Sequence, residues 1–252
     1  MSDNLRIWGQ VPKTDPKYTK PANVGGNRQT SIDGVYMVKI ITEILGPVGI
    51  GWGYSVVEER YENTKPVMIK SESGLEILRD GGSIVWEQNH TIRIEMWAED
   101  RSNTFSQFGH TKFRYMKSDG SKMIIDDEAP KKSLTDAMKK CLSLLGVCSD
   151  VFMGEFDDKA YQDAAKLEND LKKADDKEAE YQSKLDELRA FVADKAVAIS
   201  HCPNMESVGR VYALADRKLV RECPILGLDL EHEREQINSA YHARSKELES
   251  EQ

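Results

Sequence analysis

Apolar residues recur at helical spacing between Thr30 and Leu45 and would form one face of a helix. Thr30 can cap the start of this helix, and the pair Gly46-Pro47 ends it. Alternation of apolar with polar or small residues then predicts three strands, at 50–56, within 83–99 and within 104–117. Residues 63–82 are interrupted by Gly and Pro and are interpreted as a hairpin excursion between the first two strands.

A second helix is predicted over residues 133–151. Ser133 and Asp136 resemble a capping box, with Asp in place of the usual Glu or Gln. At about 100° per residue the apolar side chains cluster on one side of this helix, whereas Lys139 and Lys140 fall on the other. The order helix, three sequential strands, helix favours an α+β fold: an antiparallel β-β-β meander that carries the helices on one face.

The composition changes from residue 159 onward and becomes rich in Ala, Lys, Glu and Asp. Apolar residues between Leu167 and Val192 follow a 4-3 spacing, which predicts one heptad seam that Glu178 weakens. Two further helices are predicted, over 205–222 with an end before Pro224, and from about 230 to 248. We expect residues 159–252 to form an acidic α-helical C-terminal domain, either a small bundle or a helical hairpin on a stalk.

Residues 1–29 are polar and contain three prolines and the pair Gly25-Gly26. They predict an extended N-terminal arm with little regular structure. The arm carries Lys13, Lys17, Tyr18 and Lys20, so it is either solvated or contacts a strand or a neighbouring subunit. Three regions are therefore expected: the arm at 1–29, a core at 30–158 and the helical region at 159–252.

The 252-residue chain has a net charge of −8, which at first argues against a nucleic-acid ligand. Residues 1–150 carry 20 Lys and Arg against 20 Asp and Glu, whereas residues 151–252 carry 15 against 23. Because the whole deficit lies in the C-terminal part, the neutral N-terminal part could still gather its lysines on one face. No apolar stretch approaches the roughly 18 residues of a membrane helix, and the first ten residues lack the features of a secretory signal.

Other kinds of site find less support. The glycines between 46 and 53 lack the Gly-Lys-Ser/Thr ending of a phosphate loop, and close packing on a strand explains them better. The four cysteines show no metal-ligand spacing, so we expect buried, reduced thiols in a cytosolic protein, with no cofactor and no covalent catalytic step. Two acidic groups leave a metal-dependent nuclease open as an alternative. They are Glu95, Glu99 and Asp100, and Asp126, Asp127 and Glu128.

Lysine clustering is the remaining signal. Lys131 and Lys132 lead into the second predicted helix, whose polar side carries Lys139 and Lys140. Lys112 and Arg114 are expected to point outward from the preceding strand. Such a row can line a channel for a phosphate backbone, and aromatic residues nearby could stack bases or belong to the core. These aromatic residues are Trp52, Tyr54, Trp97 and Tyr115. A solvated lysine face, as in a helical scaffolding protein without a DNA role, is the other interpretation.

Two motifs resemble those of one protein family. Residues 131–158, KKSLTDAMKKCLSLLGVCSDVFMGEFDD, are similar to the signature helix of the Rad fifty-two superfamily of single-strand annealing proteins, with its phage relatives of the Sak and Erf type. Upstream, Ser31-Ile32-Asp33-Gly34 leads into a helix that ends at Gly46, and Gly51-Trp52 opens the first strand, as in that family. The resemblance covers about residues 28–160, with the same order of helix, strands and helix.

This resemblance implies a specific function. Members of the family assemble into rings or helical filaments, hold single-stranded DNA in a basic groove and anneal complementary strands without ATP. Lys139 and Lys140 match the paired basic positions that hold the DNA backbone in the family. Lys131, Lys132, Lys112 and Arg114 are further candidates from their placement alone. We expect a phage-encoded protein in the bacterial host cytoplasm, whose C-terminal region recruits an exonuclease or a single-strand-binding protein.

Overall fold

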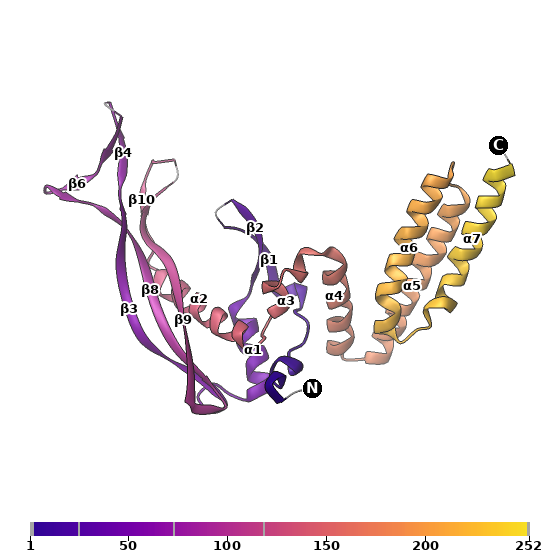
Figure 1. Ribbon diagram of the computed structural model, residues 1–252, viewed down its shortest axis with the longest axis horizontal. Coiled ribbons are helices and arrows are strands. Elements are labelled where there is room, and N and C mark those ends of the chain that lie inside the picture. Colours follow the sequence, from indigo (N-terminus) through magenta and orange to yellow (C-terminus); the bar gives the residue numbers. More distant parts are fainter. Residues whose placement is uncertain (1–2, 25, 73, 118, 251–252) are drawn as a thin grey trace. The chain divides into compact units, whose positions relative to one another are not determined.

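The computed structural model describes residues 3–24, 26–72, 74–117 and 119–250 (Figure 1). The chain divides into two compact units, the first made of Met1–Pro12 and Tyr18–Met153 and the second of Lys13–Lys17 and Gly154–Gln252. The fold is mixed α+β, as predicted, with a curled antiparallel sheet in the first unit and a helical C-terminal region.

The first unit is built on a four-stranded antiparallel sheet in the order β10-β9-β8-β3. Its strands are β3 (Trp52–Pro66), β8 (Trp86–Ala98), β9 (Asp100–Met116) and β10 (Met123–Ile125). The predicted three-strand meander is therefore present, and β10 adds a short edge strand beside the end of β9. Between β3 and β8 the chain forms two small hairpins, β4 (Met68–Ser71) with β5 (Gly74–Ile77) and β6 (Arg79–Asp80) with β7 (Ser83–Ile84).

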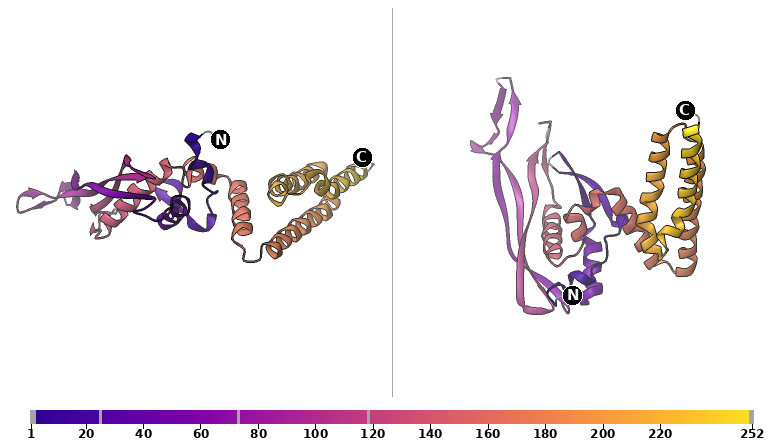
Figure 2. Two further views of the ribbon diagram at one scale, coloured as in Figure 1. Left: turned by 90° about the horizontal axis from the view of Figure 1, so that it is seen from below. Right: turned by 45° about the vertical axis from the view of Figure 1, so that its right-hand side comes forward.

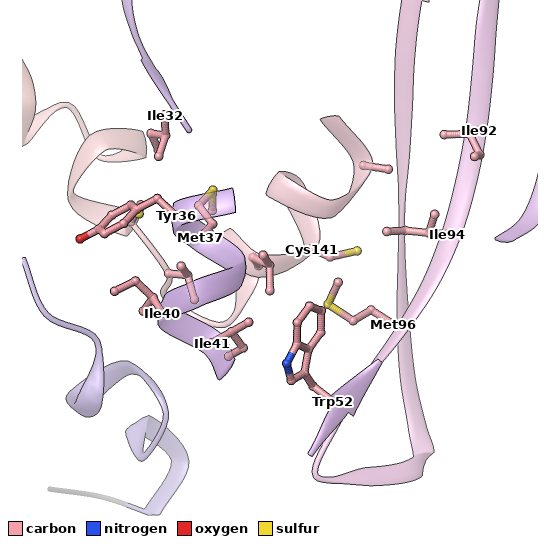
Figure 3. Packing of buried hydrophobic residues seen from close by; sticks show 14 residues of the cluster. Ile32, Tyr36, Met37, Ile40, Ile41, Trp52, Ile92, Ile94, Met96 and Cys141 are labelled. Atoms are coloured by element: carbon pink, nitrogen blue, oxygen red, sulfur yellow. The ribbon is translucent and has the colours of Figure 1, made fainter. Parts of the chain in front are cut away.

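The core lies between the sheet and the helices α1 (Gly34–Leu45) and α2 (Ala129–Leu144) (Figure 3). The alternation of β8 points Ile92, Ile94 and Met96 toward the helices, where all three are buried. Burying each of these side chains contributes about 1.5–3 kcal/mol relative to leaving it in water. Trp52 at the start of β3 is almost fully buried in the same cluster.

Gly109 on β9 lets α2 approach the sheet closely. A Cβ atom at this position would lie 1.9 Å from the carbonyl oxygen of Ser133 and 2.7 Å from the amide nitrogen of Ala137. A Cβ atom there would overlap these backbone atoms of α2. The helix can therefore pack this closely on β9 only because residue 109 is glycine.

The N-terminal arm is more regular than expected. The strands β1 (Thr19–Val24) and β2 (Asn27–Ile32) pair as an antiparallel hairpin, and three short 3-10 turns precede it. These turns are η1 (Asp3–Leu5), η2 (Trp8–Gln10) and η3 (Pro16–Tyr18). The hairpin escaped prediction because it is largely polar and holds Pro21, which a two-stranded edge tolerates.

Thr30 consequently lies in β2 and does not cap the first helix. Asp33 does so instead, because its side chain accepts hydrogen bonds from the amide nitrogens of Val35 at 2.7 Å and Tyr36 at 3.3 Å. The helix α1 therefore begins at Gly34 and ends at Leu45 as expected.

Both the start and the end of the second helix also lie earlier in the chain than predicted. It begins at Ala129 with Pro130 in its first turn, a position where a missing amide costs nothing. Ser133 is fully buried inside this helix and does not form the expected capping box. The helix ends at Leu144 because Gly146 adopts a φ of 92°, and a short helix α3 (Ser149–Phe152) follows.

The second unit is helical, with η4 (Glu155–Asp157), α4 (Lys159–Lys173), α5 (Lys177–Ser200), α6 (Met205–Leu226) and α7 (Leu230–Ser250) (Figure 2). The single heptad seam was wrong, because Asp176 caps a new helix and so separates α4 from α5. Pro224 lies inside α6, near its end. The helix tolerates it there because the carbonyl that loses its amide donor belongs to Val220, an exposed residue that water can reach. Of the helices in the described residues, none is long and apolar enough to cross a membrane.

Residues 13–17 belong to this second unit and pack against α4. The Nζ atom of Lys13 lies 2.5 Å from Oε1 of Glu168, and Nζ of Lys173 lies 2.5 Å from Oδ2 of Asp15. Thr14 between them is fully buried. Residues 13–17 of the predicted arm are therefore an ordered segment, the strap, that packs on α4.

Replacing Gly109 by Ala should destabilise the first unit by about 1–3 kcal/mol or more, because the new methyl group overlaps the backbone of α2. The four tryptophans all lie in the first unit, so urea unfolding followed by their fluorescence reports this unit alone. The matched control is Gly209→Ala in α6, where a Cβ meets nothing within 4 Å. That change should raise helix stability by about 0.5–1 kcal/mol in circular dichroism. Equal tryptophan unfolding curves for Gly109→Ala and the wild type would contradict the proposed contact.

Candidate nucleic-acid interface

Lys139 lies half-buried on α2, where the helix passes the junction of β2 and α1. Its Nζ atom donates a hydrogen bond to the carbonyl oxygen of Ile32, and its stem passes the backbone of Gly34. Burial lowers the pKa of Lys139, whereas the carboxylates of Asp33 and Asp136 act in the opposite direction. No carboxylate of the described residues contacts this ammonium, so its charge lacks a direct counter-charge.

Lys140 connects α2 to the outer edge of β9. Its Nζ atom lies 3.0 Å from the carbonyl oxygen of Phe108 and 2.8 Å from Oδ2 of Asp136. The same carboxylate accepts a hydrogen bond from the amide of His110 at 3.2 Å. Lys140 and Asp136 together therefore satisfy backbone groups that an edge strand would otherwise expose.

Lys131 and Lys132 lie at the start of α2, and each has a carboxylate partner. Lys132 is 2.6 Å from Oδ2 of Asp126, and this hydrogen bond raises the pKa of the lysine and lowers that of the carboxyl. Lys131 is 2.8 Å from Oε2 of Glu128, and its side chain is 78% exposed. A phosphate that binds either lysine must compete with its carboxylate partner, which makes these contacts weak.

The two cationic residues predicted on a strand, Lys112 and Arg114, lie near the C-terminal end of β9. Arg114 donates from Nε to the carbonyl oxygen of Trp86 at 3.0 Å, and Nζ of Lys112 lies 5.5 Å from the ring centre of Tyr115. Tyr115 in turn is close enough to Lys132 to influence its pKa. The structure thus brings Lys112, Arg114 and Lys132 to one end of the sheet, while Lys139 and Lys140 lie further along α2.

Lys20 is a cation that the sequence did not connect with this site. It lies on β1, and its positive charge helps to lower the pKa of Lys139. The sequence placed Lys20 in an unstructured arm, so nothing local indicated that the hairpin carries it toward α2.

Two of the predicted aromatic residues, Trp52 and Trp97, lie on opposite faces of the sheet. Trp52 is buried in the core, whereas the Trp97 ring lies over Gly53 and is stacked by Arg101 at 4.8 Å. On the same strand face, the guanidinium of Arg93 lies 5.9 Å from the ring centre of Phe108. The expected close packing is confirmed for Gly53, whereas Gly46 and Gly49 adopt φ angles of 91° and 86° and a Cβ atom on either would meet nothing within 4 Å.

Four of the six carboxylates considered as metal ligands, Glu99, Asp100, Asp126 and Glu128, are engaged in other contacts. Arg6 binds Glu99, Asp100 accepts from the amide of Ser102 at 2.9 Å, and Asp126 binds Lys132. Within the described part of the chain, His, Cys, Asp and Glu side chains form no group of three that could hold a metal ion.

The cysteines are all buried and free, as expected. Burial raises the pKa of Cys141 to about 11, so this thiol stays protonated at neutral pH.

Comparison of the sequence with protein families and with curated proteins adds no relative: no family model matches, and no curated protein matches at a significant level.

Lys140→Met should destabilise the first unit by about 0.5–1.5 kcal/mol, because the carbonyl of Phe108 and the carboxylate of Asp136 each lose a hydrogen bond. The control is Lys131→Met, which removes the same charge from an exposed ion pair and should change stability by less than about 0.5 kcal/mol. Urea unfolding followed by tryptophan fluorescence measures both. Equal effects of the two substitutions would show that Lys140 has no structural role at the edge of β9.

Proposed function

We propose that this protein binds single-stranded DNA and anneals complementary strands without ATP, as a ring or helical homo-oligomer in homologous recombination. The observation that supports this proposal best is the environment of Lys139. This partly buried ammonium has lost hydration and bonds to a carbonyl oxygen, while the carboxylates of Asp33 and Asp136 lie near enough to act on its charge but form no hydrogen bond with it in the described residues. A phosphate oxygen would supply a directly bonded anionic partner.

The neighbouring cations extend this site along α2. Lys140 follows Lys139 directly, Lys20 lies nearby on β1, and Lys131 and Lys132 precede them on the same helix. Contacts between lysines and phosphates release counter-ions, which offsets the repulsion between two DNA strands. In this proposal Lys112 and Arg114 are secondary contacts at the end of the sheet.

Annealing requires that bound DNA can still shift its register. Lys131, Lys132 and Lys140 each share their charge with a carboxylate, so a single phosphate contact with them is weak. An oligomer repeats the weak contacts along the strand, and the sum of many such contacts binds firmly while each one exchanges. Such a reaction needs no covalent catalytic step and no cofactor.

The second unit has a separate part in the proposal. It contains 17 Lys and Arg against 24 Asp and Glu, so it carries most of the net negative charge of the chain, and it forms its own hydrophobic core. We assign to it the recruitment of an exonuclease or a single-strand-binding protein, in the cytoplasm of a bacterial host infected by the phage that encodes it.

The decisive experiment is fluorescence-quench annealing of two complementary oligonucleotides without ATP. The wild type should anneal them rapidly at low salt. Lys139→Met should slow annealing about tenfold or more, because the change keeps the side-chain stem but removes the charge at every subunit. The control Lys177→Met removes one exposed charge from α5 and should leave the rate unchanged.

Two outcomes would count against the proposal. Absence of annealing by the folded wild type at any salt concentration would refute the function, and cleavage of the labelled strand with divalent ions would then favour the nuclease alternative. Unchanged annealing by a Lys139→Met/Lys140→Met double variant would retain the function but remove α2 as the DNA site.

A further inference from the structure

The two edges of the main sheet differ in how far their backbone hydrogen-bonding groups are occupied. Along β9, the Phe108 carbonyl and the His110 amide are bound by side chains of α2, and the Phe113 carbonyl accepts from the Asp126 amide at 2.8 Å. β10 then covers the end of the same edge. On the other edge, β3 pairs only with β8, and in the described residues no other backbone group bonds to Gly53–Pro66. The sheet therefore has one closed edge and one open edge.

The open edge also carries exposed apolar side chains. The helix α2 packs over β8 and β9, and most of β3 stays uncovered. Val56 is 48% exposed and Tyr61 is 49% exposed, and Tyr54 lies in the same row on the helix side of the sheet. In the hairpin of β4 and β5 the cross-strand pair Met68 and Ile77 is also exposed. Exposed apolar side chains gathered along one edge are typical of an interface.

The same two edges also differ in charge. Residues 54–87, which span most of β3, the two small hairpins and the first two residues of β8, contain seven Asp and Glu against four Lys and Arg, and one of the seven, Glu87, is buried on β8. Residues 112–125, which form the end of β9 and β10, contain four Lys and Arg against one Asp. Of these, Lys112, Lys117 and Lys122 form no ion pair in the described part of the chain.

The acidic and basic segments extend from the same end of the sheet (Figure 1). Gln88 of β8 pairs with Asn63 on one side and with Arg114 on the other, so these three residues form one row across the sheet. Beyond that row β3 continues into the acidic hairpins, and β9 continues into the basic turn toward β10. Two copies placed side by side in the same orientation would bring the acidic segment of one against the basic segment of the next.

We propose that copies of this chain associate head to tail, with the acidic, apolar β3 edge (residues 54–87) of one copy docked on the basic β9–β10 edge (residues 112–125) of its neighbour. This interface rests on the oligomer of the proposed function and names its surfaces. Because different surfaces meet, each added copy leaves one edge of each kind free, so assembly proceeds to a closed ring or an open filament. Lys139 and Lys140, on α2, lie outside both segments.

Charge reversal on each edge tests this interface in the absence of DNA. The variant Lys117→Glu/Lys122→Glu makes both edges acidic, and Glu72→Lys/Glu76→Lys makes both basic, with all four side chains exposed. Multi-angle light scattering at about 20 µM protein should show an assembly for the wild type. Each variant alone should fall toward the 28.5 kDa mass of one chain. A 1:1 mixture of the two variants should reassemble, because each acidic edge then finds a basic one.

The control variant is Lys177→Glu/Lys246→Glu, which makes the same charge change on exposed residues of α5 and α7 and should assemble like the wild type. Circular dichroism confirms that each variant is folded. A wild type that runs as a single chain would overturn the interface, as would folded variants that keep the wild-type mass or a mixture that fails to reassemble. Annealing assays remain separate: assembly that follows these charge rules without annealing would refute the proposed function and leave the interface standing.

Discussion

The contact between α2 and β9 at Gly109 is the constraint on which the first unit depends. Because no side chain stands between the two backbones, Ser133 can reach the carbonyl of His90, with 3.1 Å between Oγ and the oxygen. The apolar side of the helix then closes the core over β8, and its polar side meets the edge of β9. A larger residue at position 109 would lift the helix and separate all of these contacts at once.

The same close approach gives two neighbouring lysines different roles. Lys140 is drawn onto the strand edge, where its ammonium stabilises the fold and is partly neutralised by Asp136. Lys139 points toward β2 and bonds to the carbonyl of Ile32, so its ammonium has no directly bonded carboxylate in the described residues, although Asp33 and Asp136 act on its charge. Of the two matched basic positions, the structure therefore makes Lys139 the stronger candidate for a phosphate contact and Lys140 a residue whose loss also affects stability.

Local periodicity was sufficient for the strands and for most of the helical regions, because alternation and helical spacing are properties of neighbouring residues. Contacts between distant segments were not accessible in this way. The Ser133 motif looks like a cap, yet its hydroxyl is used by a strand more than forty residues away. The polar hairpin that holds Lys20 shows no alternation, and the strap at residues 13–17 is ordered by Asp15 and Lys13 pairing with α4. The sequence could place Lys139 on a polar helix face, but only the fold shows what it contacts.

The pairing of lysines with carboxylates along α2 bears directly on annealing. A row of unpaired lysines would hold phosphates tightly and would resist the shifts of register that a search for complementarity requires. Here Lys131 and Lys132 already have carboxylate partners. The binding free energy of a phosphate is therefore only the difference between a lysine–phosphate and a lysine–carboxylate interaction. Such exchange is sensitive to salt and is individually weak, and its strength then depends on repetition along an oligomer. The electrostatics of one chain thus support the proposed oligomer as the form that would anneal DNA.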